Sequence, residues 1–202
     1  MILEPGSIST GAMYNFMIAM VVPRPIAFVS TVNPQGRRNL APFSYFNCIS
    51  SEPPLIGISI LNRQDDPKDT LRNIRDVREF VVNLVNESLL DAMVQTSGEW
   101  PETADEFEIA GLGAEVSDVV KPPRVKESPV ALECRLHQEV TLGTASFVVG
   151  EILRVHVADD ILTNGRVDVL KLRPVGRLGG EGYCVVREVL QRSRPKVART
   201  VE

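Results

Sequence analysis

Residues 23–54, PRPIAFVSTVNPQGRRNLAPFSYFNCISSEPP, decide the fold class of this chain. The apolar stretches Ile26–Val32 and Asn39–Cys48 flank the turn sequence Asn-Pro-Gln-Gly, a pattern that predicts the two strands of a β-hairpin. Both predicted strands also contain hydroxyl and amide side chains, namely Ser30, Thr31, Asn39, Ser44 and Asn47. A buried polar group without a partner costs about 1–3 kcal/mol. We therefore expect this hairpin to hold a polar ligand against a β-scaffold.

Composition excludes several classes of protein. The 202 residues are 44% hydrophobic, which suits one good core and is short for two. The net charge of −4, with no basic block, argues against a nucleic-acid partner. We see neither a signal peptide nor an apolar run of the roughly 18 residues that a membrane span needs. Three widely spaced cysteines without a CxxC pair argue against zinc and against a disulfide framework. We expect a cytoplasmic protein without a metal.

The middle of the chain predicts strands interrupted by two helices. LIGISIL at 55–61 places Ile56, Ile58 and Ile60 on one face of a strand. Asp66 is the expected N-cap of a helix with Pro67 in its first turn. EFVVNLV at 79–85 is another strand, and Ser88 is expected to cap a second helix that runs through Gln95.

The last part of the chain predicts a long hairpin. Residues 96–123 contain the only tryptophan and an acidic cluster, and we interpret them as an irregular surface excursion. Residues 130–142 and 146–158 alternate between apolar and polar, with the polar face, including Glu133, wet or covered by a partner. Residues 193–202 predict a flexible tail. Without a βαβ rhythm, the pattern predicts a mainly β protein, an antiparallel barrel with flanking helices. We expect one domain over 1–202, with its core at about 15–187.

Several sequence strings, taken together and in order, resemble one known family. They are PRPIAFVST, NLAPFSYFN, KDTLRNI, EFVVNLV, PPRVKESPVALECRL and RLGGEGY, and they extend from Pro23 to Tyr183. They are similar to the flavin reductase-like, FMN-binding split-barrel family, and most of all to its flavoredoxin-type branch. The resemblance implies an antiparallel Greek-key split β-barrel, a homodimer, and FMN bound in a groove at the subunit boundary.

The start of the predicted helix is the candidate phosphate site. Lys68, Asp69 and Thr70 lie in its first turn, where free N–H groups and the helix dipole favour an anion. Lys68 and Thr70 would bond the phosphate of FMN, whereas Asp69 has the wrong charge and is expected to cap the backbone. An ordinary helix start without a ligand is the alternative from spacing alone, and the resemblance favours the phosphate.

The remaining candidate cofactor-binding residues follow the family motifs. They are Arg24, Ser30, Thr31, Asn39, Leu40, Ala41, Ser44, Tyr45, Phe46, Asn47 and Tyr183. The resemblance implies that the segment Asn39–Ala41 offers backbone groups to the flavin ring edge. Ser44 and Asn47 are favoured as ligand groups, while the two aromatics between them could equally belong to the core.

Other candidates keep an alternative. Ser30 and Thr31 could bond ring-edge or ribityl oxygens, or serve the turn that follows. Arg24 could clamp a phosphate or a flavin carbonyl, or pair with a carboxylate. Tyr183 could cover the ring. No nucleophile–base–acid set is visible, so we predict no catalytic side chain, and a proton-relay role for His156 is a lesser alternative.

The functional expectation is an FMN-dependent oxidoreductase of the NAD(P)H:flavin reductase type. NADH or NADPH would give a hydride to bound FMN, which passes electrons to a free flavin or another small-molecule or protein acceptor. The cofactor carries the difficult chemistry, and the protein orients it. The alternatives are an FMN-binding electron carrier that does not oxidise NAD(P)H itself, and a non-redox ligand-binding dimer.

Overall fold

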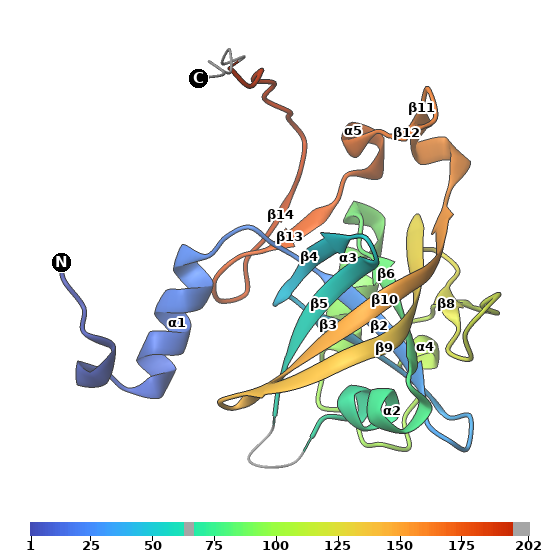
Figure 1. The fold of residues 1–202 in the computed structure, drawn as a ribbon, viewed down its shortest axis with the longest axis horizontal. Coiled ribbons are helices and arrows are strands. Elements are labelled where there is room, and N and C mark those ends of the chain that lie inside the picture. Colours follow the sequence, from blue (N-terminus) through green and yellow to red (C-terminus); the bar gives the residue numbers. More distant parts are fainter. Residues whose placement is uncertain (63–66, 196–202) are drawn as a thin grey trace, which may run out of the picture.

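The computed structural model describes residues 1–62 and 67–195, and its main body is a curled antiparallel sheet (Figure 1). The order of its seven strands is β3-β2-β6-β9-β10-β5-β4. Their bounds are β2 Ala27–Val32, β3 Arg38–Phe43, β4 Phe46–Ser51, β5 Pro54–Leu61, β6 Glu79–Leu84, β9 Val130–Leu142 and β10 Ala145–Val157. The predicted mainly β fold is confirmed, including both strands of the long hairpin to within one residue.

Helices and smaller sheets flank this body. The helices are α1 (Thr10–Met20), α2 (Asp69–Val77), α3 (Leu90–Thr96), α4 (Glu106–Ile109) and α5 (Val169–Leu172), with 3₁₀ turns at Pro5–Ser7, Glu87–Leu89 and Asp159–Ile161. A three-stranded sheet joins β1 (Arg24–Pro25), β13 (Val175–Arg177) and β14 (Tyr183–Val185). Two short pairs complete the set, β7 (Ala114–Glu115) with β8 (Arg124–Val125), and β11 (Leu162–Thr163) with β12 (Arg166–Val167).

The core fills the inside of the curled sheet, and α2 covers one end of it (Figure 1). Ile56, Ile58 and Ile60 point into it and are at most 1% exposed, as the alternation predicts. Leu71 and Ile74 of α2 pack against the same cluster. Each such side chain contributes about 1.5–3 kcal/mol by burial. The helix is therefore held at the barrel end by its apolar side, which leaves its first turn at the rim.

The predicted strand Asn39–Cys48 is wrong as one element, because the chain breaks at Ser44 and Tyr45. β3 pairs with β2, whereas β4 pairs with β5, with Phe46 opposite Ile58. Because β3 and β4 are the two edges of the sheet, the Ser44–Tyr45 link crosses the gap between them. The curl of the sheet brings its edges together, so the chain bends at this point. The link marks the split of the barrel.

Two helix starts differ from the prediction. α2 begins at Asp69 rather than at Pro67, because the Lys68 carbonyl accepts the first helical hydrogen bonds. Asp66, the expected N-cap, lies outside the described residues. Asn86 caps the turn before α3, accepting from the Leu89 N–H at 3.2 Å. The Ser88 hydroxyl instead donates to the Asn86 side chain, because Ser88 already lies inside the 3₁₀ turn.

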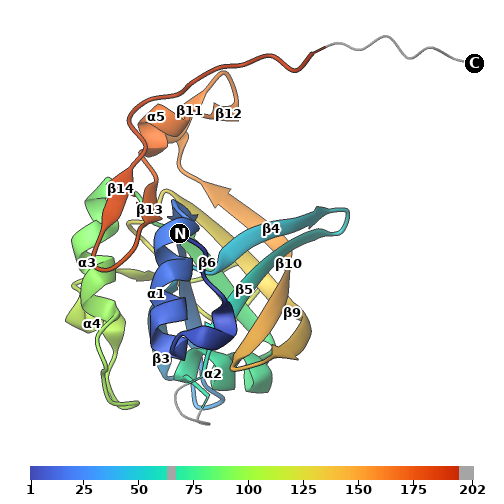
Figure 2. The ribbon, with the colours of Figure 1, turned by 90° about the vertical axis from the view of Figure 1, so that its left-hand side faces the viewer.

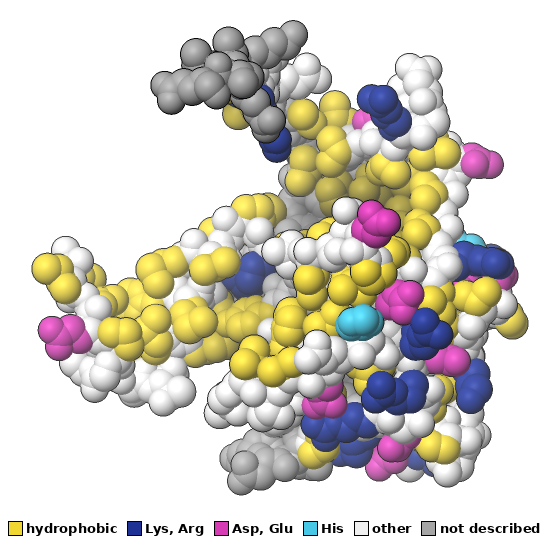
Figure 3. Space-filling view, in the orientation of Figure 1, with side chains coloured by type: hydrophobic (Ala, Val, Ile, Leu, Met, Phe, Trp, Pro, Cys, Tyr) yellow, Lys and Arg dark blue, Asp and Glu magenta, His cyan; other side chains and the backbone are white. Residues whose placement is uncertain are grey.

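Helix α1 stands to one side of the barrel in Figure 1, and in the view of Figure 2 it lies in front of it. None of its residues is buried. The large side chains of Tyr14, Met17 and Met20 are 42–62% exposed on it, although they are mainly apolar. Figure 3 shows hydrophobic side chains gathered along this arm and across the neighbouring face of the barrel. In the described part of the chain, no helix has the length and apolar character to cross a membrane. The described end of the predicted tail, residues 193–195, is exposed and without secondary structure.

Candidate functional site

A pocket of about 270 Å³ opens at the split of the barrel. The start of α2, the end of β3, the excursion at 96–123 and the β13–β14 sheet all contribute to its wall. The predicted site residues in that wall are Asn39, Ala41, Ser44, Lys68, Asp69, Thr70 and Tyr183. The fold thus brings residues far apart in the sequence to one cavity. The rest of the predicted set lies elsewhere.

The polar end of the pocket is the first turn of α2. Thr70 is 1% exposed, and its hydroxyl accepts a hydrogen bond from the Asn39 amide at 3.0 Å. The Lys68 ammonium lies 5.5 Å from the centre of the Phe43 ring. Asp69 does not cap the helix as predicted, because Lys68 occupies the N-cap position and Asp69 is the first helical residue. Its carboxylate instead forms an ion pair with Arg72, which offsets its charge. The unpaired N–H groups at the start of this nine-residue helix, the Lys68 ammonium and the Thr70 hydroxyl therefore lie in the same part of the pocket wall. All three kinds of group favour an anion.

Three predicted residues lie behind the pocket wall. The buried Thr31 hydroxyl accepts from the amides of Asn39 and Asn73 at 3.3 and 3.0 Å, so it orients Asn39. The Ser30 hydroxyl donates to the Pro123 carbonyl at 2.5 Å and thereby holds the excursion. Leu40 is fully buried, and its backbone N–H donates to Glu106 at 3.1 Å. These residues support the wall and do not line it.

A second hollow of about 320 Å³ lies on the other side of Ser44. Tyr45, Phe46 and Asn47 line it together with Met17 and Val21 of the α1 segment. Asn47 is exposed, and its side-chain oxygen accepts from the next backbone N–H at 2.9 Å. Burial, and then the neighbouring Tyr14, raise the pKa of the Tyr45 hydroxyl. Ser44 lines both hollows and so stands at their boundary.

Arg24 also lines the second hollow, but its guanidinium group is bonded to backbone carbonyls of the protein. It is 6% exposed and donates to the carbonyls of Ile18, Val21 and Leu178 at 2.6–3.0 Å. Its Nε lies 3.4 Å from the Ser44 hydroxyl, which it can donate to. Arg24 therefore ties the α1 segment and the loop before β14 to the split. This arrangement is neither the carboxylate pair nor the free clamp weighed from the sequence.

Sequence reasoning missed part of the pocket wall. Glu106 is 9% exposed, and burial above all, followed by nearby carboxylates, raises its pKa. Trp100 lies on the same wall and donates to the Gln95 carbonyl at 3.0 Å. The Arg177 guanidinium lies 4.4 Å from the centre of the Tyr183 ring. The single tryptophan in an acidic loop was the one feature of the sequence that could have pointed to this part of the wall. The places of Glu106 and Arg177 in the wall depend on tertiary contacts.

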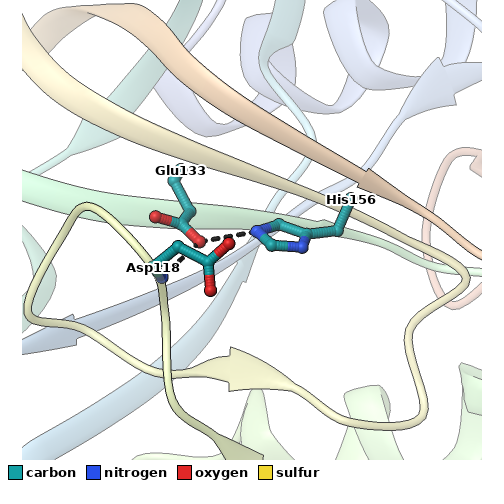
Figure 4. A group of neighbouring side chains, drawn as sticks. All are labelled: Asp118, Glu133 and His156. Carbon is teal, nitrogen blue, oxygen red and sulfur yellow. Dashed lines mark hydrogen bonds and ion pairs between the residues drawn. The ribbon is translucent and has the colours of Figure 1, made fainter.

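A second cluster, Asp118, Glu133 and His156, has side chains that can bind metals (Figure 4). Glu133 was expected on a face that is wet or covered by a partner. It is fully buried, because the excursion of the same chain covers this part of β9. Its two oxygens accept the N–H groups of Asp118 and Val119 at 2.8 and 2.7 Å. His156 Nε2 lies 2.6 Å from one of these oxygens.

This cluster acts as a clasp for the excursion. Arg154 pairs with Asp118 at 2.7 Å, and Arg124 Nε lies 3.9 Å from Glu133. Burial alone would raise the pKa of Glu133, but the two N–H donors and His156 together lower it below the usual range. A cation would compete with two guanidinium groups and with these N–H donors for the same lone pairs. His156 is also absent from the walls of both hollows beside Ser44.

The chain belongs to the flavin reductase-like family, since residues 19–171 match the model for the flavin reductase like domain. An uncharacterized protein of Aquifex aeolicus is 46% identical over 173 residues, which cover 85% of this chain and 88% of that protein. The family assignment made from the sequence strings is confirmed.

Solved structures share the whole fold. Nitrilotriacetate monooxygenase component B from Bacillus cereus superposes with a TM-score of 0.93 at 33% identity, over 95% of this chain and 98% of that one. 2-Nitrobenzoate 2-nitroreductase NbaA of Pseudomonas fluorescens superposes with a TM-score of 0.88 at 31% identity, over 96% of each chain. Flavoredoxin of Desulfovibrio vulgaris (Miyazaki F) superposes with a TM-score of 0.79 at 25% identity, over 96% of this chain and 97% of that one. The fold is that of the flavin reductase-like split barrels, and the protein belongs with flavin-related oxidoreductases.

Proposed function

We propose that this protein is an FMN-dependent oxidoreductase that takes a hydride from NADH or NADPH and passes the electrons to a flavin or another acceptor. The observation that carries the proposal is the pocket at the barrel split. Its wall combines the first turn of α2, with Lys68 and Thr70, and the aromatic side chains Trp100 and Tyr183. A flat ligand with an anionic tail needs these two kinds of surface.

The residues of the polar end fit the phosphate of FMN. Lys68 supplies a positive charge, Thr70 supplies a hydroxyl, and the α2 dipole favours a negative group at this position. Asp69 does not oppose binding, because Arg72 pairs with it. Ser44, at the boundary of the two hollows, would then meet the ring or the ribityl chain.

The protein's own part in the reaction is to bind and orient. Bound FMN would supply the redox chemistry between the nicotinamide and the acceptor. In the part of the chain that the structure describes, the pocket wall holds no histidine or cysteine, so acid–base groups there are limited to its carboxylates, its lysine and its tyrosine. Trp100 and the Arg177–Tyr183 pair offer aromatic faces and a positive charge in the same wall, and they are our candidates to receive a nicotinamide dinucleotide.

We further propose a homodimer in which a second copy covers α1. A helix that buries none of its own residues and exposes Tyr14, Met17 and Met20 needs an apolar partner to be stable. The second hollow is continuous with this arm, since Met17 and Val21 line it. Sedimentation should give a dimer, and Met17→Asp with Met20→Asp should give a folded monomer. A wild-type monomer at micromolar concentration would contradict the dimer.

The three free cysteines, of which Cys48 is exposed, suit the reducing cytoplasm that we propose as its location.

Anaerobic mixing of the FMN-loaded protein with NADH or NADPH tests the proposed function. Loss of the oxidised flavin absorbance on mixing supports the reductase. A persistent oxidised spectrum, with FMN still bound, would identify an electron carrier that needs a partner protein. A colourless protein that takes up no added FMN would contradict flavin binding and leave a non-redox module. Heat-denatured protein with free FMN measures the uncatalysed rate.

A further inference from the structure

Arg177 brings a positive charge into the wall of the pocket at the barrel split. It is the last residue of β13, and its register partner on β14 is Tyr183. The guanidinium carbon lies 4.4 Å from the centre of the Tyr183 ring, so the two planar groups are in contact. Both residues are partly buried, and both line the pocket. The ring therefore restricts the positions that the guanidinium group can take.

The hydrogen-bond donors of Arg177 are mostly without an acceptor from the protein. A guanidinium group carries five N–H donors. Among the described residues, the Gly182 carbonyl is the one acceptor, and its oxygen lies 3.3 Å from Nη1, just beyond the usual N–H···O range of about 2.7–3.2 Å. No carboxylate of the described residues pairs with Arg177, and the acidic residue that is nearest in the sequence, Glu181, is exposed. The charge of Arg177 is therefore not balanced within the described chain.

Arginines on other elements beside the pocket differ from Arg177 in this respect. Arg24 donates to three backbone carbonyls. Arg38 and Arg72 each form an ion pair with an aspartate. These three guanidinium groups hold the protein together, whereas Arg177 keeps donors for a ligand. An arginine that is held against an aromatic ring and has free donors suits a phosphate, which it can bind through two parallel hydrogen bonds.

We propose that Arg177 binds a phosphate group of the nicotinamide dinucleotide, separately from the FMN phosphate at the start of α2. The inference rests on the proposed function. NADH and NADPH share a pyrophosphate, and NADPH has a further phosphate on the ribose 2′ position, a group that arginine accommodates in other folds. Either phosphate accepts hydrogen bonds from a guanidinium group. Arg177 is then a residue that determines specificity for the electron donor.

Arg177→Met tests this assignment, because methionine keeps an unbranched stem beside the Tyr183 ring and removes the charge and every donor. Anaerobic stopped-flow mixing of the FMN-loaded protein with increasing NADPH or NADH measures two quantities, the dissociation constant of the donor and the limiting rate of flavin bleaching. We expect the dissociation constant for NADPH to rise about tenfold or more, as for a lost charge-assisted hydrogen bond, with an unchanged limiting rate.

The two donors distinguish the two phosphates. A rise confined to NADPH would assign the 2′-phosphate to Arg177, and an equal rise with NADH would assign the shared pyrophosphate. Titration calorimetry of the FMN-loaded protein with adenosine 2′,5′-bisphosphate gives a readout that does not depend on hydride transfer. The dissociation constant of this probe should rise in Arg177→Met as well.

Three controls accompany the variant. Arg166→Met is the same replacement at an exposed residue of β12 outside the pocket wall, and it should follow the wild type. Arg177→Lys keeps the charge but not the paired donors, and it should lose less affinity than Arg177→Met. Thermal unfolding checks that each variant is folded, and Arg177→Lys carries the test if Arg177→Met does not fold.

The outcomes separate this inference from the function on which it rests. Unchanged dissociation constants for both donors would overturn the role of Arg177 alone. An equally large rise in the dissociation constant for FMN would also overturn it, because Arg177 would then hold the flavin phosphate. A wild-type protein whose bound flavin stays oxidised with both donors would contradict the proposed function together with this inference.

Discussion

The β9–β10 hairpin and the β3–β4 link use the same barrel in different ways. Each strand of the hairpin is 13 residues long and pairs on both sides, β9 with β6 and β10, and β10 with β9 and β5. The link Ser44–Tyr45 is the point where pairing stops, between the two edge strands of the sheet. The paired region supplies stability, and the unpaired region supplies the cavity. Substitutions should therefore separate these two properties.

The largest effect is expected in the paired region. Phe80 on β6 is fully buried, and its ring occupies the space beside Gly150 on β10. Phe80→Ala should lower the free energy of unfolding by about 3–5 kcal/mol, because the cavity it leaves cannot collapse fully. Urea denaturation followed by circular dichroism measures this. A loss below about 1 kcal/mol would mean that the sheet interior is not the source of stability.

The clasp on β9 should have the next largest effect. Glu133→Gln replaces a buried carboxylate that accepts two backbone N–H groups and lies beside His156, and it should lower the free energy of unfolding by about 2–3 kcal/mol at pH 7. Glu151→Gln, in an exposed pair with Arg135 on the same hairpin, should change it by less than about 1 kcal/mol.

The clasp also predicts a direction with pH. The pKa of Glu133 is lower in the folded protein than in the unfolded chain, where it is about 4.5. The contribution of Glu133 to the free energy of unfolding is therefore complete above pH 4.5 and is lost as the pH falls through the pKa of the folded state. The difference in the free energy of unfolding between the wild type and Glu133→Gln should shrink below pH 4.5. A difference that grows on acidification would contradict the clasp.

At the split, substitutions should change affinity more than stability. Lys68→Ala should weaken FMN binding about tenfold, or about 1.4 kcal/mol, the lower end for a charge-assisted hydrogen bond at a pocket rim. Lys126→Ala, at a lysine that lines a different hollow and not this pocket, should leave the affinity unchanged. Fluorescence titration compares the two. Equal dissociation constants would remove the start of α2 from the phosphate site.

The smallest effect is expected at the link itself. Ser44→Ala removes a hydroxyl that borders both hollows and that Arg24 reaches only at 3.4 Å. We expect the FMN dissociation constant to rise a few-fold, about 0.5–1 kcal/mol, with little change in the midpoint of thermal unfolding. A loss of stability without a change in affinity would make Ser44 a structural residue.

The same contrast explains what the sequence could predict. Strands β5, β9 and β10 were predictable, because alternation over many residues reports which face is buried. The break at Ser44 was not, since the residues on both sides favour strands and only closure of the barrel decides where the chain bends. The helix α2 was also predictable, although it begins at Asp69 and not earlier, and its first turn lines the pocket.

Other parts of the site depend on contacts between distant segments. Glu106 and Trp100 lie in an excursion without a regular pattern, and they join the pocket because Ser30 and Glu133 hold that excursion against the barrel. Glu133 itself follows the polar alternation of β9, and it is buried only because the excursion covers it. Local periodicity carries no information about such coverage. The part of the pocket wall at the start of α2 could therefore be predicted, and the part contributed by the excursion could not.

The most direct test of the central claim is a crystal structure of the protein with FMN. We expect the phosphate within hydrogen-bond distance of Lys68 and Thr70 at the start of α2, and the ring beside Ser44 at the split. FMN bound elsewhere, with the first turn of α2 facing only solvent, would contradict the claim that the barrel split is the flavin site.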